Sequence, residues 1–435
     1  MDKLELKPAV HFSGFVKDLP GSKSIANRVL PLAALTGLGG TTIENLPDGE
    51  DVTLMRKALE QLGVSISANK GGVHVLGTRK QFSAPPEGTD LFLGNSGTAT
   101  RILTALLAAG TGTFRIDGIP RMRERPIGDL VDALRSLAGP DGTRIFYENK
   151  EGFLPLRIEA RGLAGGKTRI RGDLSSQFTT GLLMALPLCR GACEVVVEGH
   201  LVSAPYVDLS MKIMEHFYGK IEREGHHRFW VENPSGYHFR NGIFRVEPDA
   251  SSASYFLAAG AIAGGPVTVF GLQKDSPQGE IGFTDVLERM GAKIEFGEHG
   301  IKVSSSGKLH GGDFDMDLMS DTGMTLAVTA LFAEGPTTIR NIGNWRVKET
   351  DRIKAMATEL RKLGATVEEG KDSLVIHSPA ILTPHVEIDT YNDHRMAMCF
   401  SLVCLGPRGV PVTIRNPDCV GKTYPKYFEK FLELA

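Results

Sequence analysis

The sequence is poor in cysteine, which limits its redox and metal chemistry. Only five cysteines occur in 435 residues, and none stands in a CxxC pair or at the spacing of a zinc site with histidine. They are Cys189, Cys193, Cys399, Cys404 and Cys419. This usage is typical of a cytoplasmic protein with reduced core thiols, so we expect no disulfide and no metal ion.

An excess of positive charge and a long hydrophobic run are also missing. Lysine and arginine number 49, aspartate and glutamate 51, and the net charge is −2. Proteins that bind nucleic acids or membrane surfaces usually carry a basic excess, so we expect neither partner. No apolar run reaches the roughly 20 residues that span a bilayer, and residues 1–5 lack the character of a signal peptide. We therefore expect a cytoplasmic protein that acts on small molecules as a monomer.

Several common catalytic motifs are absent. The sequence contains no HExxH and no GxSxG, which argues against zinc proteases and serine hydrolases. Residues 21–24, GSKS, lack the G-x-x-x-x-G-K-[ST] spacing of a P-loop, so ATP hydrolysis is not expected.

What the sequence does contain is an internal repeat. Six segments open with a small or polar residue and continue with small and apolar residues at helical spacing, and their starts lie about 70–80 residues apart. They begin at Gly21, Asn95, Ser175, Asp249, Asp321 and Asn392. Most are followed by a glycine-rich break, a β-branched strand, a more polar helix that ends in Leu-Gly or Met-Gly, and a further strand. The repeating unit is therefore predicted to be β-α-β-α-β-β.

Six such units predict an α/β fold of two domains with three repeats each. We expect a discontinuous domain of residues 1–21 plus 245–435 around a continuous domain of residues 22–244, with the active site in the cleft between them. The polar, aromatic stretch at 226–242 is the expected boundary. The strand at 3–10 could complete the last repeat, which is cut short at the C-terminus and whose opening strand could come from elsewhere in the chain.

Basic side chains gather where these helices begin and where strands end. Surface lysine and arginine normally scatter along outer helix faces, whereas here they recur beside Gly, Ser or Asn at equivalent points of several repeats. The set comprises Lys23, Arg28, Arg101, Arg121, Arg123, Arg125, Lys348, Arg352, His394, Arg395 and Lys422. Three acids, Asp51, Asp321 and Glu349, lie among them.

This constellation suits anionic ligands. Helix starts and forked guanidinium groups bind phosphate and carboxylate oxygens, and an acid among cations stays ionised and can take a proton from a bound hydroxyl. Two structural alternatives stay open, namely plain N-caps for the helices and a solvated loop for RMRER at 121–125. The residues predict a two-domain enzyme that acts on small, multiply anionic substrates by acid–base chemistry and closes on binding.

Eight segments spread across the chain carry a family resemblance. They are PGSKSIANRVLPLAAL, LFLGNSGTATRILTA, RMRERPIGDLVDALR, DLSSQFTTGLLMALPL, PDASSASYFLAAGAI, NWRVKETDRIKAMATELRKLGA, DTYNDHRMAM and VGKTYPKYF. Together they resemble the 5-enolpyruvylshikimate-3-phosphate synthase family, which implies a two-domain inside-out α/β barrel of six repeats. The resemblance also implies transfer of the enolpyruvyl group of phosphoenolpyruvate to the 5-hydroxyl of shikimate 3-phosphate. The transfer runs by addition and elimination through a tetrahedral intermediate, with no metal or organic cofactor.

The resemblance assigns residues to each substrate. For shikimate 3-phosphate the implied contacts are Lys23, Ser24, Arg28, Ser175, Ser176, Gln177, Ser203, Asp321, Asn344 and Lys348. For phosphoenolpyruvate they are Lys23, Gly97, Arg125, Gln177, Arg352, Arg395 and Lys422. Asp321 is implied as the group that takes the 5-hydroxyl proton, and Glu349 with Lys23 as the acid–base pair at the methylene carbon.

One loop departs from the common pattern of that family. The family often reads LGNAGTAMRPL where this chain reads LGNSGTATRIL, with Ser96, Thr100 and Ile102 in place of Ala, Met and Pro. Without that proline the backbone of the first helical turns is less constrained. We therefore expect an altered sensitivity to glyphosate, the inhibitor that binds the family's phosphoenolpyruvate site. Where the family often has DAAM, the chain reads DTGM from Asp321, so the acid is retained.

Two other functions compete with this interpretation. UDP-N-acetylglucosamine enolpyruvyl transferases share the fold and the donor, but they usually carry a cysteine in the loop that here holds RMRER, and K-N rather than K-S-x-x-N-R at the first helix. A non-catalytic anion-binding repeat protein would not need Asp321 and Glu349 amid cations.

Overall fold

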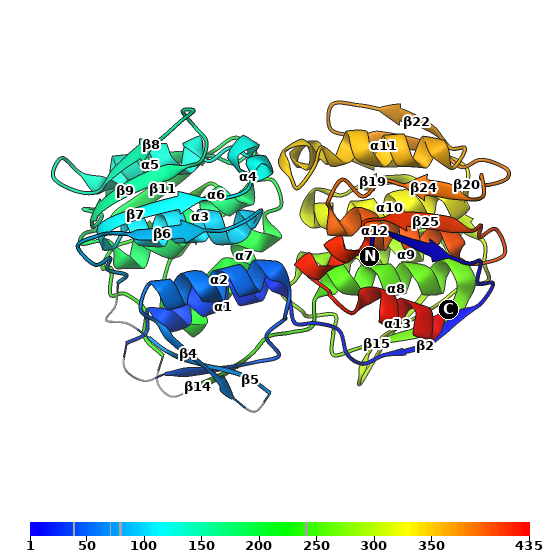
Figure 1. Ribbon diagram of the computed structural model, residues 1–435, viewed down its shortest axis with the longest axis horizontal. Helices are drawn as coiled ribbons and strands as arrows, with labels where there is room; N and C mark the ends of the chain where they lie inside the picture. Colours follow the sequence, from blue (N-terminus) through cyan, green and yellow to red (C-terminus); the bar gives the residue numbers. More distant parts are fainter. Residues whose placement is uncertain (38–39, 70, 78–80, 240–241) are drawn as a thin grey trace. The chain divides into compact units, whose positions relative to one another are not determined.

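The chain folds into two compact units (Figure 1). The structure, a computed structural model, describes residues 1–37, 40–69, 71–77, 81–239 and 242–435. One unit spans residues 23–246 without interruption, and the other combines residues 1–22 with residues 247–435. The chain therefore passes from one unit to the other twice. None of the described helices is long and apolar enough to cross a bilayer.

Sheets of one design form the frame of the 23–246 unit. Over the described residues it has three four-stranded sheets, in which a first strand runs parallel to a second and two further strands follow antiparallel. The orders are β14-β3-β5-β4, β6-β7-β9-β8 and β10-β11-β13-β12. The strands are β3 (Thr41–Glu44), β4 (Ser65–Asn69), β5 (Gly72–Leu76), β6 (Thr89–Phe92), β7 (Thr111–Asp117), β8 (Arg144–Tyr147), β9 (Leu156–Arg161), β10 (Gly166–Arg171), β11 (Cys193–Glu198), β12 (Glu222–Glu224), β13 (Arg228–Val231) and β14 (Gly242–Arg245).

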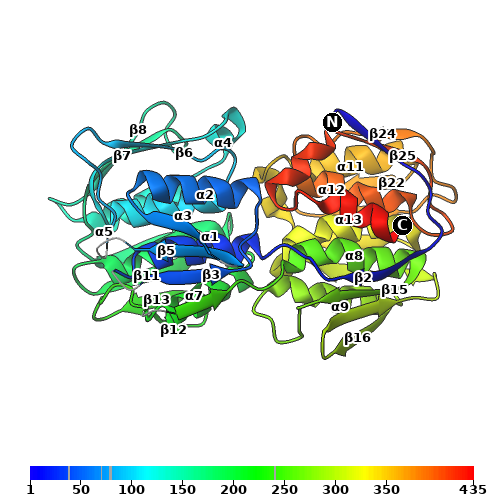
Figure 2. The ribbon, with the colours of Figure 1, turned by 60° about the horizontal axis from the view of Figure 1, so that its bottom comes forward.

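The helices of this unit divide into a buried and a half-exposed set. All of α3 (Gly97–Ala108) is buried, because its residues are small or apolar on every side apart from Arg101, whose guanidinium group donates to the carbonyl oxygens of Gly97 and Pro126. The amphipathic α5 (Gly128–Ala138) instead buries Leu130, Leu134 and Leu137 on one face. Figure 2 shows α1 and α3 inside the unit, with β7 and β8 to one side and β12 and β13 to the other. The remaining helices are α1 (Lys23–Ala34) and α6 (Ser176–Ala185) in the buried set, and α2 (Glu50–Gln61), α4 (Pro120–Glu124) and α7 (Pro205–His216) around them.

The other unit repeats this design with one shorter sheet. Its sheets have the orders β2-β15-β17-β16, β19-β21-β23-β22 and β24-β25-β1, beside a two-stranded pair of β18 and β20. The strands are β1 (Lys3–Leu6), β2 (Phe12–Val16), β15 (Gly264–Phe270), β16 (Lys293–Gly297), β17 (Gly300–Ser304), β18 (Leu309–His310), β19 (Asp313–Asp315), β20 (Ala333–Glu334), β21 (Thr337–Arg340), β22 (Thr366–Glu369), β23 (Leu374–His377), β24 (Val386–Ile388) and β25 (Val412–Arg415). The buried helices are α8 (Ala250–Ala263), α10 (Gly323–Thr329) and α12 (His394–Phe400), and the outer ones are α9 (Phe283–Arg289), α11 (Arg352–Lys362) and α13 (Tyr427–Leu434).

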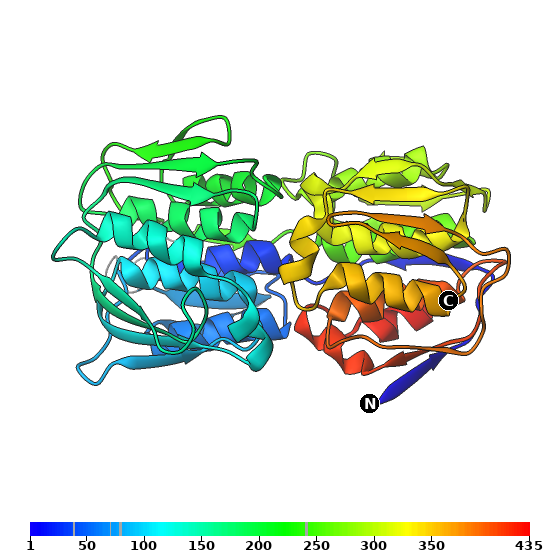
Figure 3. The ribbon, with the colours of Figure 1, turned by 90° about the horizontal axis from the view of Figure 1, so that it is seen from above.

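Three repeats are completed by strands from distant parts of the chain. The first repeat takes β14, which pairs parallel with β3, and the fourth takes β2, which pairs parallel with β15. The last repeat has its own opening strand, β24, directly before α12, and β1 completes it by pairing antiparallel with β25. The prediction that the first strand completes the last repeat is therefore confirmed, although the strand ends at Leu6. Figure 3 shows both chain ends in this unit.

The chain leaves the 23–246 unit after the stretch at 226–242, which the sequence predicts as the boundary between the domains. The stretch contributes β13 and the start of β14, and both strands belong to sheets of the 23–246 unit. Residues 240–241 of this stretch lie outside the described residues.

Within each unit, polar side chains link the buried helices to one another. The Gln177 side-chain amide, at the start of α6, donates to Thr98 Oγ1 at the start of α3 over 3.3 Å. In the other unit the hydroxyls of Ser254 and Thr325 lie 3.0 Å apart and link α8 to α10. Thr325 Oγ1 also lies 3.7 Å from Cys399 Sγ of α12. Gln177 and Thr98 thus join the starts of α6 and α3, whereas Ser254, Thr325 and Cys399 join α8, α10 and α12 within the helices.

Candidate functional site

Lys23 is the first residue of α1 and is held by an acid at the start of α2. Its Nζ lies 3.2 Å from Oδ2 of Asp51, and the two side chains are 14% and 2% exposed. Asp51 stands in the first turn of α2, where the helix dipole favours a carboxylate. The ammonium group is thus fixed beside a helix start while a part of it stays accessible. We use the name Lys23 cluster for the predicted site residues at or near the helix starts of this unit, which are Lys23, Ser24, Arg28, Gly97, Arg125, Ser175, Ser176, Gln177 and Ser203.

Arg28, one turn after Lys23, ties α1 to α7. Its Nε donates to Ser210 Oγ over 2.7 Å, and its terminal nitrogens donate to the carbonyl oxygens of Ser24 and Tyr206 over 2.7 and 3.2 Å. Arg28 is 2% exposed. This side chain therefore holds the helix starts together, whatever else it binds.

Gly97 is a glycine because two guanidinium groups lie against its Cα. A Cβ at this position would come within 2.5 Å of Arg125 Nη2 and 3.0 Å of Arg101 Nη1. Arg125 Nη1 donates to both the carbonyl and the side-chain oxygen of Asn95, each over 3.1 Å. Arg101 donates to the carbonyl of Pro126 over 2.6 Å. The first turn of α3 is therefore lined by positive charge at van der Waals distance.

The other two arginines of the RMRER segment do not join the cluster. Arg121 Nη1 lies 3.0 Å from Glu124, and Arg123 Nη2 lies 2.7 Å from Asp117, and Arg123 is exposed. Both stand on the short helix α4 rather than on a solvated loop, with their side chains partly exposed, whereas Arg125 is 3% exposed.

Polar groups of the next helix starts complete the Lys23 cluster. Ser175 is the N-cap of α6, where its Oγ accepts from the Gln177 amide over 3.3 Å, and Ser176 follows it as a buried residue. Ser203, just before α7, is buried with a φ of +54°. That left-handed backbone costs a non-glycine residue roughly 1–2 kcal/mol, and such strain is often kept at functional sites.

Asp321 is the centre of the charged groups in the other unit. Its Oδ1 lies 3.0 Å from Arg352 Nη1 and 3.5 Å from Lys348 Nζ, and its Oδ2 lies 2.9 Å from Arg395 Nη2. Burial would raise the pKa of Asp321, but Arg395 and Lys348 outweigh burial and hold the pKa well below its usual range. Both carboxylate oxygens are thus occupied by cations, and the group is ionised. We call these residues the Asp321 cluster.

Arg352 is held by acids on more than one side. Its Nη2 lies 2.8 Å from Glu349 Oε2, and its Nε lies 2.8 Å from Asp393 Oδ2. Burial alone would lower the pKa of Arg352, but Asp393 and Glu349 raise it above its usual range. The Arg352 side chain is 1% exposed, and its guanidinium group has a fixed orientation at the start of α11.

Arg395 and Lys422 are further buried cations of this unit. Arg395 donates to Tyr255 OH over 3.3 Å and to Ser251 Oγ over 3.4 Å, both on α8. Lys422 ends a short helical turn that packs against α12, and it is 6% exposed. Asn344 is 7% exposed and donates to Ser320 Oγ over 3.3 Å, next to Asp321. Four buried or half-buried cations therefore surround the Asp321 carboxylate or stand on helices packed beside it.

Sequence reasoning missed Asp393, Tyr255 and Ser251. Asp393 had a signal, because an aspartate directly before a helical segment is a common N-cap, and its side chain accepts from the Arg395 amide over 3.0 Å. Its second role as the partner of Arg352 depends on tertiary contact. Tyr255 and Ser251 lie on an apolar helix and carry no signal of their contact with Arg395.

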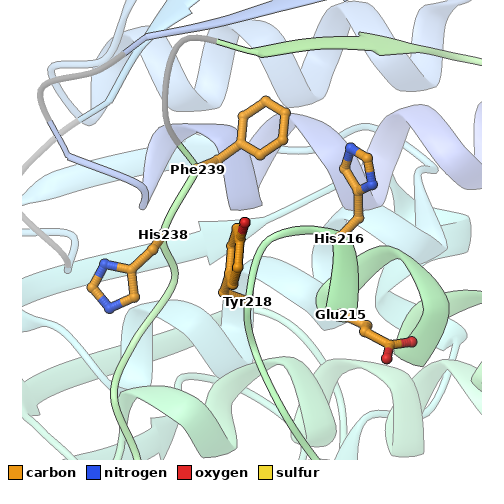
Figure 4. Close-up of a pocket in the computed structure, with 5 residues that line it drawn as sticks. All are labelled: Glu215, His216, Tyr218, His238 and Phe239. Carbon is orange, nitrogen blue, oxygen red and sulfur yellow. The ribbon is translucent and has the colours of Figure 1, made fainter.

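A cavity in the 23–246 unit lies away from the predicted site residues. It has a volume of about 800 Å³ and is lined by Glu215, His216, Tyr218, His238 and Phe239. In Figure 4 the carboxylate of Glu215 and the ring of His238 point away from each other. The cavity therefore offers no group of converging charges like those of the two clusters.

Comparison with known proteins gives a consistent match over the whole chain. A family model described as EPSP synthase (3-phosphoshikimate 1-carboxyvinyltransferase) matches residues 6–431. The 3-phosphoshikimate 1-carboxyvinyltransferase of Paraburkholderia phytofirmans is 55% identical over 444 residues, which cover 100% of both chains. The protein of the same name from Burkholderia multivorans is 54% identical, also over 100% of both chains.

Solved structures have the same fold. The EPSP synthase of Acinetobacter baumannii matches with a TM-score of 0.79 at 25% identity and covers 100% of this chain and 98% of its own. The enolpyruvyl transferase NikO of Streptomyces tendae matches with a TM-score of 0.77 at 19% identity over 100% and 97% of the two chains. At that identity the second likeness concerns the fold alone.

Proposed function

Because the chain belongs to the EPSP synthase family, we propose that its two charged clusters serve one reaction. The reaction is the transfer of the enolpyruvyl group of phosphoenolpyruvate to the 5-hydroxyl of shikimate 3-phosphate, with release of phosphate, as a step of aromatic amino-acid biosynthesis. The observation that carries the assignment of roles is the Asp321 carboxylate held among Lys348, Arg352 and Arg395. A carboxylate fixed among cations stays ionised, so it can accept a proton from a bound hydroxyl once a substrate takes over some of those cations.

Each substrate carries one phosphate and one carboxylate, which the buried cations can neutralise. The acceptor binds Lys23, Ser24, Arg28, Ser175, Ser176, Gln177, Ser203, Asp321, Asn344 and Lys348 in this proposal. The donor binds Lys23, Gly97, Arg125, Gln177, Arg352, Arg395 and Lys422. The guanidinium groups of Arg125, Arg352 and Arg395 support this division, because their planar forks match phosphate and carboxylate oxygens. In this proposal, residues of both clusters contact the two substrates.

Three groups move the protons. The 5-oxygen attacks C2 of phosphoenolpyruvate while Asp321 takes its proton, and Glu349 with Lys23 protonates the methylene carbon to give the tetrahedral intermediate. Glu349 with Lys23 then takes a proton back from the new methyl group, the C–O bond to phosphate breaks, and the double bond is restored as phosphate leaves. Asp321 must exchange some of its cation contacts to act as a base, and the anionic substrates supply the competing charge. We expect no metal ion or cofactor to be required.

The test is a coupled product assay. The protein with shikimate 3-phosphate and phosphoenolpyruvate should release one phosphate per enolpyruvyl product, and Asp321→Asn should lower kcat by about 10²–10⁴-fold. UDP-N-acetylglucosamine as the acceptor should give no phosphate. The names of the relatives also favour shikimate 3-phosphate over that acceptor and over a non-catalytic role. The proposal would be refuted if phosphate were released with UDP-N-acetylglucosamine but not with shikimate 3-phosphate. It would also be refuted if neither acceptor gave phosphate.

We also infer that the protein acts as a monomer in the cytoplasm. All residues assigned to the two substrates come from one chain, so no second copy is needed to complete the site. Sedimentation equilibrium with both substrates present should give the mass of a single chain, and a stable dimer would contradict this.

A further inference from the structure

One face of α11 carries two buried charged side chains that contact the same short segment. Arg352 and Glu359 lie seven residues apart, about two helical turns. Arg352 Nε donates to Asp393 Oδ2 over 2.8 Å. Glu359 Oε1 accepts from Tyr391 OH over 2.7 Å, and its Oε2 accepts from the Asp389 amide over 3.1 Å. The segment 389–393 is therefore held at both ends by one helix.

The held segment has a backbone that needs support. Tyr391 and Asn392 are consecutive non-glycine residues with φ of +53° and +54°. Left-handed backbone is unfavourable for tyrosine and less so for asparagine, and two such residues in succession persist where surrounding contacts fix them. Burial, and next the hydrogen bond to Glu359, raise the pKa of Tyr391, so its hydroxyl stays protonated and remains a donor. The segment leads directly into Asp393, the N-cap of α12.

The acids that hold the segment are fully buried. Glu359 and Asp393 are both 0% exposed, and Glu359 lies 2.7 Å from Lys362 Nζ. A buried carboxylate is unfavourable unless charged and polar partners compensate it, so the side chains are satisfied only in this arrangement of α11 and the segment. Asp393 also accepts from the Arg395 amide over 3.0 Å. The same carboxylate thus sets the positions of Arg352 and of the helix start that bears Arg395.

We infer that Glu359 and Asp393 are positioning residues that clamp segment 389–393 to α11, Glu359 from the helix and Asp393 from the end of the segment. The clamp thereby fixes the two donor-binding guanidinium groups of Arg352 and Arg395 relative to each other. The inference rests on the proposed function, which assigns both arginines to phosphoenolpyruvate. Neither acid is assigned to a substrate. A shift of about 1 Å far from the reacting atoms can cost up to about 100-fold in rate, so loss of the clamp should weaken use of the donor.

The experiment compares Michaelis constants of clamp variants for the two substrates. Glu359→Gln and Asp393→Asn should raise KM for phosphoenolpyruvate by about 10-fold, and Tyr391→Phe by about 3-fold, with KM for shikimate 3-phosphate changed less than about 2-fold. The matched control is Glu369→Gln, which removes the ion pair of Glu369 with Arg361 of the same helix but no contact with the segment. The control should leave both constants unchanged.

The inference is overturned if the clamp variants keep the wild-type KM for phosphoenolpyruvate, or if they raise both constants equally. Should the buried-acid variants fail to fold, Tyr391→Phe, which removes a single hydroxyl, decides the matter by itself. A wild-type protein without transfer activity would refute the proposed function and the inference with it. An active wild type with unaffected clamp variants would refute the inference alone.

Discussion

At the scale of single residues, neighbours in the sequence have different roles in the structure. Arg121, Arg123 and Arg125 alternate in one short segment, yet the first pairs with the exposed Glu124, the second with the buried Asp117, and the third turns toward Asn95. The sequence predicts a basic segment near a helix start. Which of its cations faces inward depends on the direction of each side chain, and so on the packing of α4 beside α3.

At Gly97 we expect a single added methyl group to weaken the binding of phosphoenolpyruvate. In Gly97→Ala the new methyl would lie within 2.5 Å of Arg125 Nη2, so the guanidinium group must move. We expect KM for phosphoenolpyruvate to rise about 10- to 100-fold, measured by phosphate release. The variant should fold normally, since alanine is favoured over glycine in a helix by about 0.5–1 kcal/mol.

Gly297→Ala is the control for this substitution. Position 297 ends β16 in the other unit, and the nearest atom to an added Cβ lies 3.9 Å away. It should leave KM unchanged. A Gly97→Ala enzyme with wild-type KM would show that Arg125 does not need its observed position.

The depressed pKa of Asp321 gives a pH-dependent contribution to stability. A carboxyl group whose pKa is lower in the folded state stabilises the fold above its unfolded pKa, about 4, and loses this contribution as pH falls toward the folded value. The unfolding free energy of wild type minus that of Asp321→Asn should therefore be positive and constant from about pH 7 to 5, and should decline only below about pH 4. Urea unfolding at several pH values measures it. A difference that already shrinks between pH 7 and 5 would contradict the lowered pKa.

At the scale of elements, periodicity predicts the helices well and their partners poorly. The buried helices, such as α3 and α8, are read directly from runs of small and apolar residues, and all residues of both are buried. The amphipathic pattern likewise predicts the outer helices. No pattern in the sequence predicts the contact between Arg395 on α12 and Tyr255 on α8, because the two residues are 140 positions apart.

Ile102 in the middle of α3 tests how this helix shapes the proposed donor site. Ile102→Pro would remove a backbone N–H, which in a helix donates to the carbonyl oxygen four residues earlier. The proline ring would also bend the first turns of α3, which carry Gly97. We expect the inhibition constant for glyphosate to change by at least about 3-fold, alongside KM for phosphoenolpyruvate. Ile102→Val keeps the N–H and should behave as wild type. Equal inhibition constants for the wild type and the proline variant would discard the idea.

At the scale of the whole molecule, the path of the chain couples distant segments. The chain crosses between the units near residues 22 and 246, and the strands beside these crossings, β2 and β14, each complete a repeat that begins elsewhere. The two chain ends meet in one sheet through β1 and β25. Each unit thus needs segments that are far apart in the sequence.

Deleting residues 1–6 should therefore weaken a sheet formed near the C-terminus. The deletion removes the Leu6 side chain, 1% exposed, from the core and leaves β25 at the edge of its sheet. We expect the free energy of unfolding to fall by about 2–4 kcal/mol, measured in urea, and the amides of β25 to exchange faster with solvent. Glu5→Ala, on the exposed side of β1, should change the unfolding free energy by less than about 0.5 kcal/mol. Unchanged exchange in β25 would contradict the pairing.

The repeat, the fold class and the family can all be predicted from the sequence, and the match over residues 6–431 confirms the resemblance drawn from eight segments. These follow from local order, because small residues, glycines and N-caps act on their own neighbourhood in the chain. The folded chain is needed to see that Lys23 pairs with Asp51, that Asp393 holds Arg352, and that Glu359 holds the segment before α12. These partners come into contact only when distant elements pack together. The free energy of a buried charge depends on those contacts rather than on the position of the residue in the chain.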